Sequence, residues 1–343
     1  MKTVVIHAAK DLRIEERVAE SVGLGQVEIA IQAGGICGSD LHYYHHGGIG
    51  TIRIREPMIL GHEVAGTITA LGASVSEFSI GDRVAVSPSR PCSACEYCLR
   101  GMQNHCLNMR FYGSAMPMPH IQGAFRQKLV AESWQCHKVA QHISVHEAAF
   151  AEPLAVTLHA IAQAGSLLNK RVLVTGCGPI GALTVIAARA YGAREIIATD
   201  VMDPVLLKAK EVGADRTINV SENPEQLSAY AANKGYFDVI FEASGNEQAL
   251  RSGLEVIKPR GIIVQVGLGG DVSIPQNMVV AKEIELRGSF RFHEEFSLAV
   301  DMLNRGAVNV QPLLSAVYPL EKAIEAFEIA GDRSRSMKVQ LAL

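Results

Sequence analysis

The stretch RVLVTGCGPIG, residues 171–181, decides the fold, because it passes from a short apolar strand through a glycine-rich turn into a helix. In this context Gly176 permits a tight turn, Gly178 lets the backbone approach a pyrophosphate, and Gly181 allows the helix to pack closely on the strand. The first turn of such a helix offers unpaired N–H groups to an anion, and Pro179 suits that turn. The pattern therefore predicts a dinucleotide-binding unit of parallel strands and helices.

The acidic residue Asp200 closes the next strand, EIIATD, nineteen residues after Gly181. A carboxylate at this place accepts hydrogen bonds from the adenosine ribose and repels a 2′-phosphate, and the segment ATDVMDPV holds no arginine that would offset this repulsion. We therefore expect NAD or NADP as the cofactor, with NAD favoured. The alternative interpretation is a glycine-rich turn without a ligand, with Asp200 as a helix cap. The candidate cofactor-binding residues are Gly176, Gly178, Pro179, Ile180, Gly181 and Asp200.

Helix and strand patterns alternate on both sides of this turn, from Glu152 to Phe290, as in a doubly wound parallel sheet. Before it, short apolar segments from Thr3 to about Val86 are separated by Gly, Asp and Ser, which predicts a mainly β unit. After it, two helical patterns lead to MKVQLAL, residues 337–343, which we interpret as a final strand that rejoins the β unit. The predicted fold class is α/β.

The composition is that of a compact chain with about two domains, because 343 residues exceed the usual size of one domain. Hydrophobic residues make up 48% and charged residues 20%, which is typical of globular proteins. The 32 Lys and Arg against 35 Asp and Glu leave a formal charge of −3, too near neutral for the basic surface that nucleic acid or an anionic membrane requires. We therefore expect a small-molecule partner, no nucleic acid and no membrane.

The sequence predicts neither a membrane helix nor a secretion signal. Its longest apolar stretch, residues 172–188, is interrupted by glycines and a proline, and charged residues from Lys10 onward precede any apolar signal core. Seven cysteines, four of them within fifteen positions, suit thiolate ligands in a reducing compartment better than disulfides. The predicted localisation is cytoplasmic.

The four clustered cysteines have the spacing C-x2-C-x2-C-x7-C, which lets four thiolates surround one zinc ion within a short loop. They are Cys92, Cys95, Cys98 and Cys106. A closed site of this kind binds no substrate, so its zinc would order a proline-interrupted lobe, about residues 87–110, that lacks a core of its own. A nucleic-acid zinc ribbon is the rival interpretation, but few basic residues flank the cluster, essentially Arg90, Arg100 and Arg110.

Further residues of ligand type are scattered along the chain: Cys37 in GGICGSDLH, His62 and Glu63 in LGHEVAG, and Glu152 in FAEPLAV. Each has an ordinary explanation when taken alone, as a core cysteine, a hydrogen-bonded histidine or an acidic helix cap. Their spacing alone does not assemble them into one site.

Taken together, GGICGSDLH, GHEVAG, GDRVAV, the four-cysteine lobe and VTGCGPIG resemble the zinc-dependent medium-chain dehydrogenase/reductase family across almost the whole chain. Glu63 after His62, and Glu152 in AEPLAV, are similar to the polyol dehydrogenase branch typified by sorbitol dehydrogenase, whereas a typical alcohol dehydrogenase has cysteine at the place of Glu152. The segments GGICGSDLHYY, MRFYGSAMPMPH, GYFDVIFEASG and RGSFRFHEEF are similar to those of bacterial dehydrogenases that act on a sugar acid.

The resemblance implies a GroES-like β catalytic domain built from residues 1–150 and 292–343, and a Rossmann cofactor domain of residues 151–291. Relatives are dimers or tetramers, often joined edge to edge through the cofactor-domain sheet. A homodimer or homotetramer is therefore expected by analogy.

The resemblance also implies a catalytic zinc ion held by Cys37 and His62, with Glu63 as a direct ligand and Glu152 as a ligand or a water-mediated neighbour. Which glutamate binds stays open. In the family, zinc activates a secondary hydroxyl and hydride passes to the nicotinamide.

Ser39 and His42 follow Cys37 by two and five residues, and the resemblance makes them candidates for a relay that carries the alcohol proton to solvent. Their ordinary roles would be a turn cap and a surface imidazole.

A sugar-acid substrate carries a carboxylate, so its pocket requires a cation. Arg291 in SFRFHEEF is the first candidate and Arg110 in NMRFYGSAM the second. The alternative role of Arg291 is an ion pair with Glu294 or Glu295. Tyr43 is a further candidate for contact with substrate hydroxyls, or else an ordinary half-buried tyrosine.

Two further functions are open alternatives. A neutral polyol such as sorbitol or xylitol would keep the enzyme and change the substrate. A structural protein that retains the fold would be expected to lack a ligand such as Cys37 or His62, and neither is missing.

Overall fold

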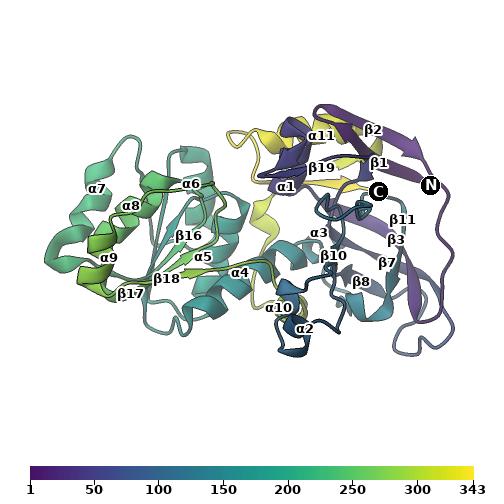
Figure 1. Cartoon of the computed structure of the whole chain (residues 1–343), viewed down its shortest axis with the longest axis horizontal. Helices are drawn as coiled ribbons and strands as arrows, with labels where there is room; N and C mark the ends of the chain where they lie inside the picture. Colours follow the sequence, from purple (N-terminus) through teal and green to yellow (C-terminus); the bar gives the residue numbers. More distant parts are fainter.

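The computed structural model describes residues 1–343 and forms two units that lie side by side, with both chain ends in the same unit (Figure 1). One unit holds a six-stranded parallel sheet, and the other is built mainly of antiparallel strands. The predicted α/β class with a doubly wound parallel sheet is confirmed. The domain boundaries given above stay predictions.

The parallel sheet has the strand order β15-β14-β13-β16-β17-β18. The chain moves outward from β13 in one direction and then returns to add β16 on its other side, which is the order of a dinucleotide-binding sheet. Its strands are β13 (Arg171–Thr175), β14 (Glu195–Asp200), β15 (Arg216–Asn219), β16 (Phe237–Glu242), β17 (Ile257–Gln265) and β18 (Glu285–Gly288). Its helices are α5 (Pro179–Ala190), α6 (Asp203–Glu211), α7 (Pro224–Ser228), α8 (Glu247–Val256) and α9 (Gln276–Lys282), with the 3-10 helix η3 (Ala229–Lys234) after α7.

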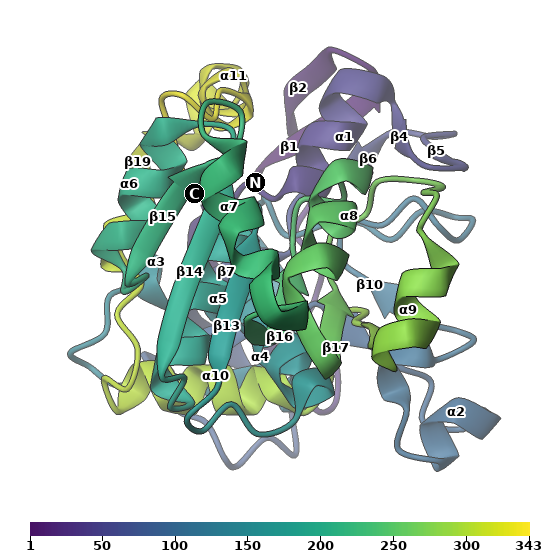
Figure 2. The same cartoon turned by 90° about the vertical axis from the view of Figure 1, so that its left-hand side faces the viewer.

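Helices cover both faces of this sheet (Figure 2), and the strand sequences explain why. In β13, Val172 and Val174 belong to one buried cluster, whereas Leu173 between them belongs to another. Successive strand residues point to opposite faces, so an uninterrupted apolar run needs cover on both.

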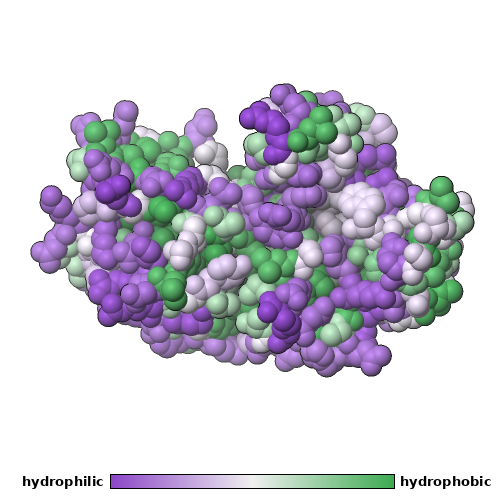
Figure 3. Space-filling model, turned by 90° about the horizontal axis from the view of Figure 1, so that it is seen from below, coloured by the Kyte–Doolittle hydropathy of each residue, from purple (hydrophilic) through white to green (hydrophobic).

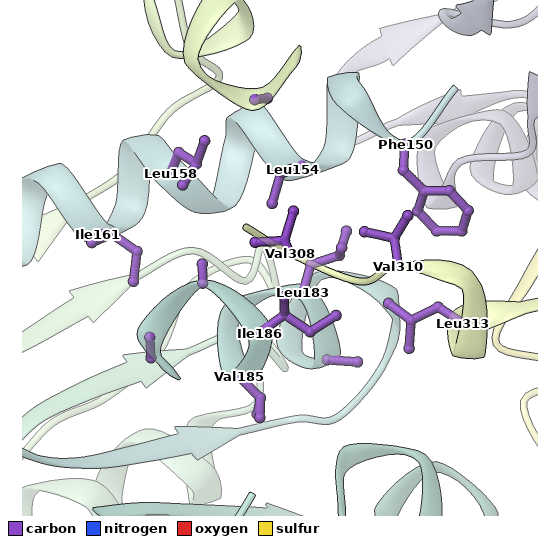
Figure 4. Close-up of a cluster of buried hydrophobic side chains, with 14 of the residues drawn as sticks. Phe150, Leu154, Leu158, Ile161, Leu183, Val185, Ile186, Val308, Val310 and Leu313 are labelled. Atoms are coloured by element: carbon purple, nitrogen blue, oxygen red, sulfur yellow. The ribbon is translucent and has the colours of Figure 1, made fainter. Parts of the chain in front are cut away.

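Helix α4 (Ala151–Ala164) precedes the first strand of this unit and packs on α5. Its side chains Leu154 and Leu158 belong to the same buried cluster as Leu183 and Ile186 of α5, the cluster that Figure 4 shows. Burying one leucine contributes about 1.5–3 kcal/mol. This packing fixes the start of α4, where Glu152 lies.

The β unit contains a sheet with the order β12-β8-β7-β3-β20-β19, and β11 pairs with β3. The predicted return of MKVQLAL is confirmed, because Leu341 of β20 lies opposite Gly34 of β3. The strands are β3 (Gln26–Gly35), β7 (Glu63–Leu71), β8 (Arg83–Val86), β11 (Lys128–Glu132), β12 (Cys136–Lys138), β19 (Leu314–Pro319) and β20 (Lys338–Ala342).

Smaller elements surround this sheet. The additional strands are β1 (Lys2–Ala8), β2 (Asp11–Glu16), β4 (Gly48–Ile49), β5 (Ile52–Arg53), β6 (Met58–Ile59), β9 (Ser89–Arg90) and β10 (Arg110–Phe111). The additional helices are α1 (Gly38–His46), α2 (Glu96–Leu99), α3 (Val145–Ala148), α10 (Glu295–Asn304) and α11 (Ala323–Gly331), with 3-10 turns η1 (Gln103–His105), η2 (Ser133–Gln135), η4 (Gln311–Leu313) and η5 (Leu320–Lys322).

Helix α1 is an addition to the half that the sequence predicts as mainly β. It starts after Cys37, whose N–H donates to the Asp40 carboxylate at 3.0 Å, and it ends at Gly47 with a φ of 68°. A left-handed residue is a usual helix stop, and glycine adopts it without a Cβ penalty. The helix places Ser39, His42 and Tyr43 beside Cys37.

Hydrophilic residues cover much of the surface seen from below, with smaller groups of hydrophobic residues between them (Figure 3). No helix reaches the length and hydropathy that crossing a membrane requires. All seven cysteines are free of disulfides.

Candidate active site

Three side chains of metal-ligand type meet where β3, α1 and β7 join. Cys37 lies two residues beyond β3, and the sheet register sets Gly35 of β3 opposite Glu63 of β7. The Cys37 thiol, a ring nitrogen of His62 and a carboxylate oxygen of Glu63 lie within 4.8 Å of one another. His62 and Glu63 are buried and Cys37 is half-buried. A thiol, an imidazole and a carboxylate are ligands that zinc prefers, so this donor set fits the predicted metal.

Two buried residues that the sequence analysis did not single out support this cluster. The Asp40 carboxylate accepts the Gly61 N–H at 3.2 Å, and its Oδ1 lies 3.9 Å from His62 Nδ1, which has no hydrogen-bond partner. Lys338 of β20 donates to both Glu63 oxygens, at 2.8 and 2.7 Å. A carboxylate behind a ligating histidine is usual in zinc sites, because it fixes the orientation of the ring.

Glu152 lies in the first turn of α4 and is 5% exposed. Burial raises the pKa of Glu152 to about 8; the charges of Glu63 and Cys37 act in the same direction, and those of His62 and Lys338 against it. Its carboxylate accepts no hydrogen bond from the protein. A divalent cation would favour the charged form of such a group. The structure thus places Glu63 within the cluster and Glu152 beside it.

Helix α1 carries three more of the predicted site residues. Ser39 is half-buried and lies two residues after Cys37, whereas His42, one turn further on, is exposed. Tyr43 is 3% exposed, and its hydroxyl accepts the Ala115 N–H at 3.1 Å. Helix α1 thus runs from half-buried Ser39 beside Cys37 to exposed His42, while Tyr43 anchors the segment that holds Ala115.

The Arg291 guanidinium is held by aromatic rings and by no carboxylate. Its Cζ lies 4.6 Å from the Phe111 ring centroid and 5.0 Å from that of Phe290, and the Phe111 ring is 5.5 Å from that of His62. Burial lowers the pKa of Arg291, against the effect of Glu152 and Tyr43. Arg291 forms no ion pair or hydrogen bond, so a partly buried cation remains available next to the ligand cluster.

The alternative ion pair of Arg291 is absent from the structure. The Glu295 carboxylate instead contacts His159 Nδ1 at 2.8 Å and accepts the His293 N–H at 2.9 Å, and Glu294 is exposed. Arg110 precedes Phe111 on β10 and is exposed. Successive strand residues point to opposite sides, so Arg110 lies away from His62.

The glycine-rich turn after β13 has the form that the sequence predicts. Gly176 has a φ of 82°, and a Cβ on Gly181 would lie 1.8 Å from the Gly176 carbonyl oxygen, so neither position accepts a side chain. A Cβ on Gly178 would meet only open space, and no side chain caps the start of α5 there. The helix start leaves room and unpaired N–H groups for a pyrophosphate, so these residues fit a dinucleotide.

A cavity of about 500 Å³ adjoins this turn and is lined by Gly176, Asp200, Val201, Asn246 and Arg333 among others. Asp200 is 5% exposed and accepts a hydrogen bond from Arg333 at 2.7 Å. The segment ATDVMDPV holds no arginine, but an arginine from a distant part of the chain pairs with Asp200. Arg333 is 133 residues further along the chain, and no local pattern indicates it.

The four clustered cysteines place their sulfurs within 4.8 Å of one another, in the arrangement that the spacing predicts for a zinc ion. Backbone N–H groups of Ala94 and Cys95 lower the pKa of Cys92 to about 6, which favours the thiolate that zinc binds. None of the four buried apolar clusters includes a residue between 87 and 110. The lobe therefore depends on its sulfurs.

We expect the Cys98→Ser variant to lose the lobe zinc ion and keep the other. Metal analysis and limited trypsin digestion measure this, and cleavage after Arg100 or Arg110 should become at least about tenfold faster, because metal binding supplies the folding free energy of such loops. Cys136→Ser is the control, since Cys136 is buried in an apolar cluster outside the lobe. Unchanged zinc content in Cys98→Ser would contradict the assignment.

Comparison with known proteins agrees with this geometry. Residues 23–141 match the alcohol dehydrogenase GroES-like domain, and residues 179–305 match the zinc-binding dehydrogenase family. The chain is 44% identical over 341 residues to L-idonate 5-dehydrogenase (NAD(P)(+)) of Escherichia coli K12, covering 99% of this chain and 98% of that one. It is 36% identical over 345 residues to sorbitol dehydrogenase of Bos taurus, at 99% and 95% coverage.

A crystal structure of L-idonate 5-dehydrogenase from Escherichia coli K-12 superimposes with a TM-score of 0.96 at 43% identity, covering 100% of this chain and 98% of that one. A dinucleotide-binding sheet beside a Cys–His–Glu cluster and a four-cysteine lobe defines a zinc-dependent dehydrogenase. The chain belongs to the zinc-binding dehydrogenase family with an alcohol dehydrogenase GroES-like domain. Within that family it is similar to L-idonate 5-dehydrogenase and to the sorbitol dehydrogenases.

Proposed function

We propose that the protein is a zinc-dependent NAD(P) dehydrogenase that oxidises a secondary hydroxyl of a sugar acid, L-idonate to 5-keto-D-gluconate, in a reversible reaction. The observation that carries the choice of a sugar acid is Arg291, a partly buried guanidinium without a carboxylate partner. The full-length similarity to L-idonate 5-dehydrogenase supports the same choice.

When bound, zinc lowers the pKa of the substrate hydroxyl and the nicotinamide accepts the hydride. Cys37, His62 and one of the two glutamates would hold the zinc ion. Asp40 lies behind the His62 ring, 3.9 Å from Nδ1, and Lys338 pairs with the Glu63 carboxylate. The uncapped start of α5 would hold the pyrophosphate.

Ser39 and His42 would carry the alcohol proton to solvent. Ser39 lies in the first turn of the helix that starts after Cys37, and His42 lies three residues further on the same helix and is exposed. Residues three apart in a helix are neighbours on its surface. The proton therefore has a short route from the site to bulk water.

Arg291 would bind the substrate carboxylate. A guanidinium presents its donors in a fork that matches a carboxylate, and Phe111 and Phe290 hold this one by its faces. Its donor edges stay free because no protein acid contacts them. The carboxylate at one end of the substrate then sets the position of the secondary hydroxyl at the other.

The test is a panel of sugar acids and neutral polyols with NAD and NADP, followed at the nicotinamide absorbance. We expect the highest kcat/KM for L-idonate, and 5-keto-D-gluconate as the product. A higher kcat/KM for sorbitol or xylitol would make the protein a polyol dehydrogenase, the alternative that its similarity to sorbitol dehydrogenases supports. No turnover of any substrate by zinc-loaded protein would favour the structural alternative.

We also propose that the protein forms a homo-oligomer through β18. This strand pairs only with β17 and is one of the two unpaired edges of the parallel sheet, and Leu286 on it is 44% exposed. Natural sheets cover or charge such edges. Two copies related by a two-fold axis would pair their β18 strands antiparallel.

We expect a dimer or tetramer in analytical ultracentrifugation, and a shift to monomer on Leu286→Glu, because the change places a charge on the proposed interface strand of each copy. Leu207→Glu is the control, since Leu207 is 71% exposed on α6, away from this edge. A wild-type monomer would contradict the proposal.

A cytoplasmic location is part of the same proposal. The two predicted zinc sites use five cysteines as thiolates, and all seven cysteines are free of disulfides. A reducing compartment keeps thiols in that form.

A further inference from the structure

We infer that Arg333 is a movable counter-ion that lets one ribose site accept both NAD and NADP. The inference rests on the proposed NAD(P) function and adds a residue that sets cofactor specificity. It follows from how the acceptor positions of Asp200 are filled.

Asp200 is fixed by the backbone. Its Oδ1 accepts the N–H groups of Val201 at 2.8 Å and Met202 at 3.2 Å, and its Oδ2 accepts that of Cys177 at 2.7 Å. The fourth hydrogen bond comes from Arg333 Nη2 to Oδ2 at 2.7 Å. A carboxylate has about four acceptor positions, so this one is full.

Only the Arg333 bond is exchangeable. Three of the four donors belong to the backbone of the turn after β13 and of the end of β14, and they cannot leave without unfolding it. The Arg333 side chain is 47% exposed, whereas that of Asp200 is 3% exposed, and Asp200 is the only hydrogen-bond or ion-pair partner of the Arg333 guanidinium. A ribose hydroxyl that bonds to Asp200 therefore replaces Arg333.

The displaced guanidinium stays at the mouth of the cavity that Asp200 lines. Arg333 belongs to the loop between α11 and β20, which extends from the β unit toward the parallel-sheet unit (Figure 1). A 2′-phosphate on the ribose would meet the fixed Asp200 charge and the displaced Arg333 charge together. Arginine binds phosphate through paired N–H donors, so the repulsion by Asp200 is offset. A 2′-hydroxyl needs no such partner.

The test measures equilibrium binding of NADH and NADPH to the full chain by the fluorescence of the reduced nicotinamide, without substrate. We expect Arg333→Ala to raise the Kd of NADPH by about ten- to a hundredfold, as for the loss of a charge-assisted hydrogen bond, and that of NADH by less than about threefold. Competition by 2′-AMP should weaken in parallel. Arg335→Ala is the control, since Arg335 is exposed on the same loop and does not line the cavity.

An equal rise in the Kd of NADH and NADPH would mean that Arg333 only holds the two units together. An unchanged Kd for both cofactors would mean that Arg333 is not part of the cofactor site. Both results would overturn the inference. Because binding is measured without turnover, failure here is separate from failure of the sugar-acid proposal, which the substrate panel tests. Weak binding of both cofactors to the wild-type protein would instead contradict the NAD(P) function itself.

Discussion

The Cys37→Ser variant should lose one zinc ion and about three orders of magnitude or more in kcat, while it keeps the lobe zinc and its fold. The reason is that the alcohol would lose the cation that stabilises its deprotonated form, an effect of several kcal/mol, and each 1.4 kcal/mol changes a rate about tenfold. The lobe sulfurs belong to a separate loop, so their zinc is unaffected. Metal analysis, circular dichroism and steady-state kinetics measure the three quantities.

The Cys98→Ser variant is the matched control, because it removes a ligand from the other cluster. The two variants should each lose one zinc ion, but the large fall in kcat should accompany the loss of zinc only in Cys37→Ser. Activity that survives Cys37→Ser with unchanged metal content would show that the cluster at Cys37 and His62 is not the catalytic site.

The Arg291→Leu variant should lower kcat/KM for L-idonate by about ten- to a hundredfold, and that for an uncharged polyol by less than about tenfold. A charge-assisted hydrogen bond contributes about 1.5–3 kcal/mol, and a neutral hydroxyl loses roughly half of that. The misplaced carboxylate also displaces the secondary hydroxyl, so kcat should fall together with the apparent affinity.

Arg110→Leu is the control, because that arginine is exposed and lies on the other side of β10 from Phe111. The Arg110→Leu variant should change kcat/KM by no more than about twofold for either substrate. An equal fall in kcat/KM for both substrates in Arg291→Leu would mean that Arg291 has a structural role and that another group binds the carboxylate.

Much of the fold was predictable because its signals are local. The turn at 176–181 works through φ angles and close contacts within a few residues, and the structure shows the same contacts. The four lobe cysteines lie within one short loop, so their spacing alone brings the sulfurs together. Strands such as β13, whose three central residues are all apolar, indicate a sheet that is covered on both faces.

The residues that support the site were not predictable, because tertiary contacts bring them in from distant positions. Lys338 reaches Glu63 only because β20 pairs with β3 at the far end of the chain. A lysine in the mostly apolar strand pattern of MKVQLAL was the available signal, since a buried lysine requires an acidic partner. Arg333 lies in a polar loop that resembles any other, so no sequence pattern connects it with Asp200.

The assembly of Cys37, His62 and Glu63 stands between these cases. Each residue was a ligand candidate in the sequence, but only the resemblance to a family placed the three in one site. The reason is that residue spacing does not give the register of β3 and β7. The ordinary role of Arg291 as an ion-pair partner was excluded by the contacts of Glu295 with His159 and His293.

The central claim is that Arg291 positions a sugar acid by its carboxylate so that a secondary hydroxyl faces the metal at Cys37. A crystal structure of the zinc-loaded protein with NADH and 5-keto-D-gluconate, with anomalous data at the zinc edge, tests it most directly. We predict two zinc peaks for each chain, one at Cys37 and His62 and one among the lobe cysteines, with the ligand carboxylate against the Arg291 guanidinium. A ligand whose carboxylate lies away from Arg291, or a metal peak in the lobe alone, would contradict the account.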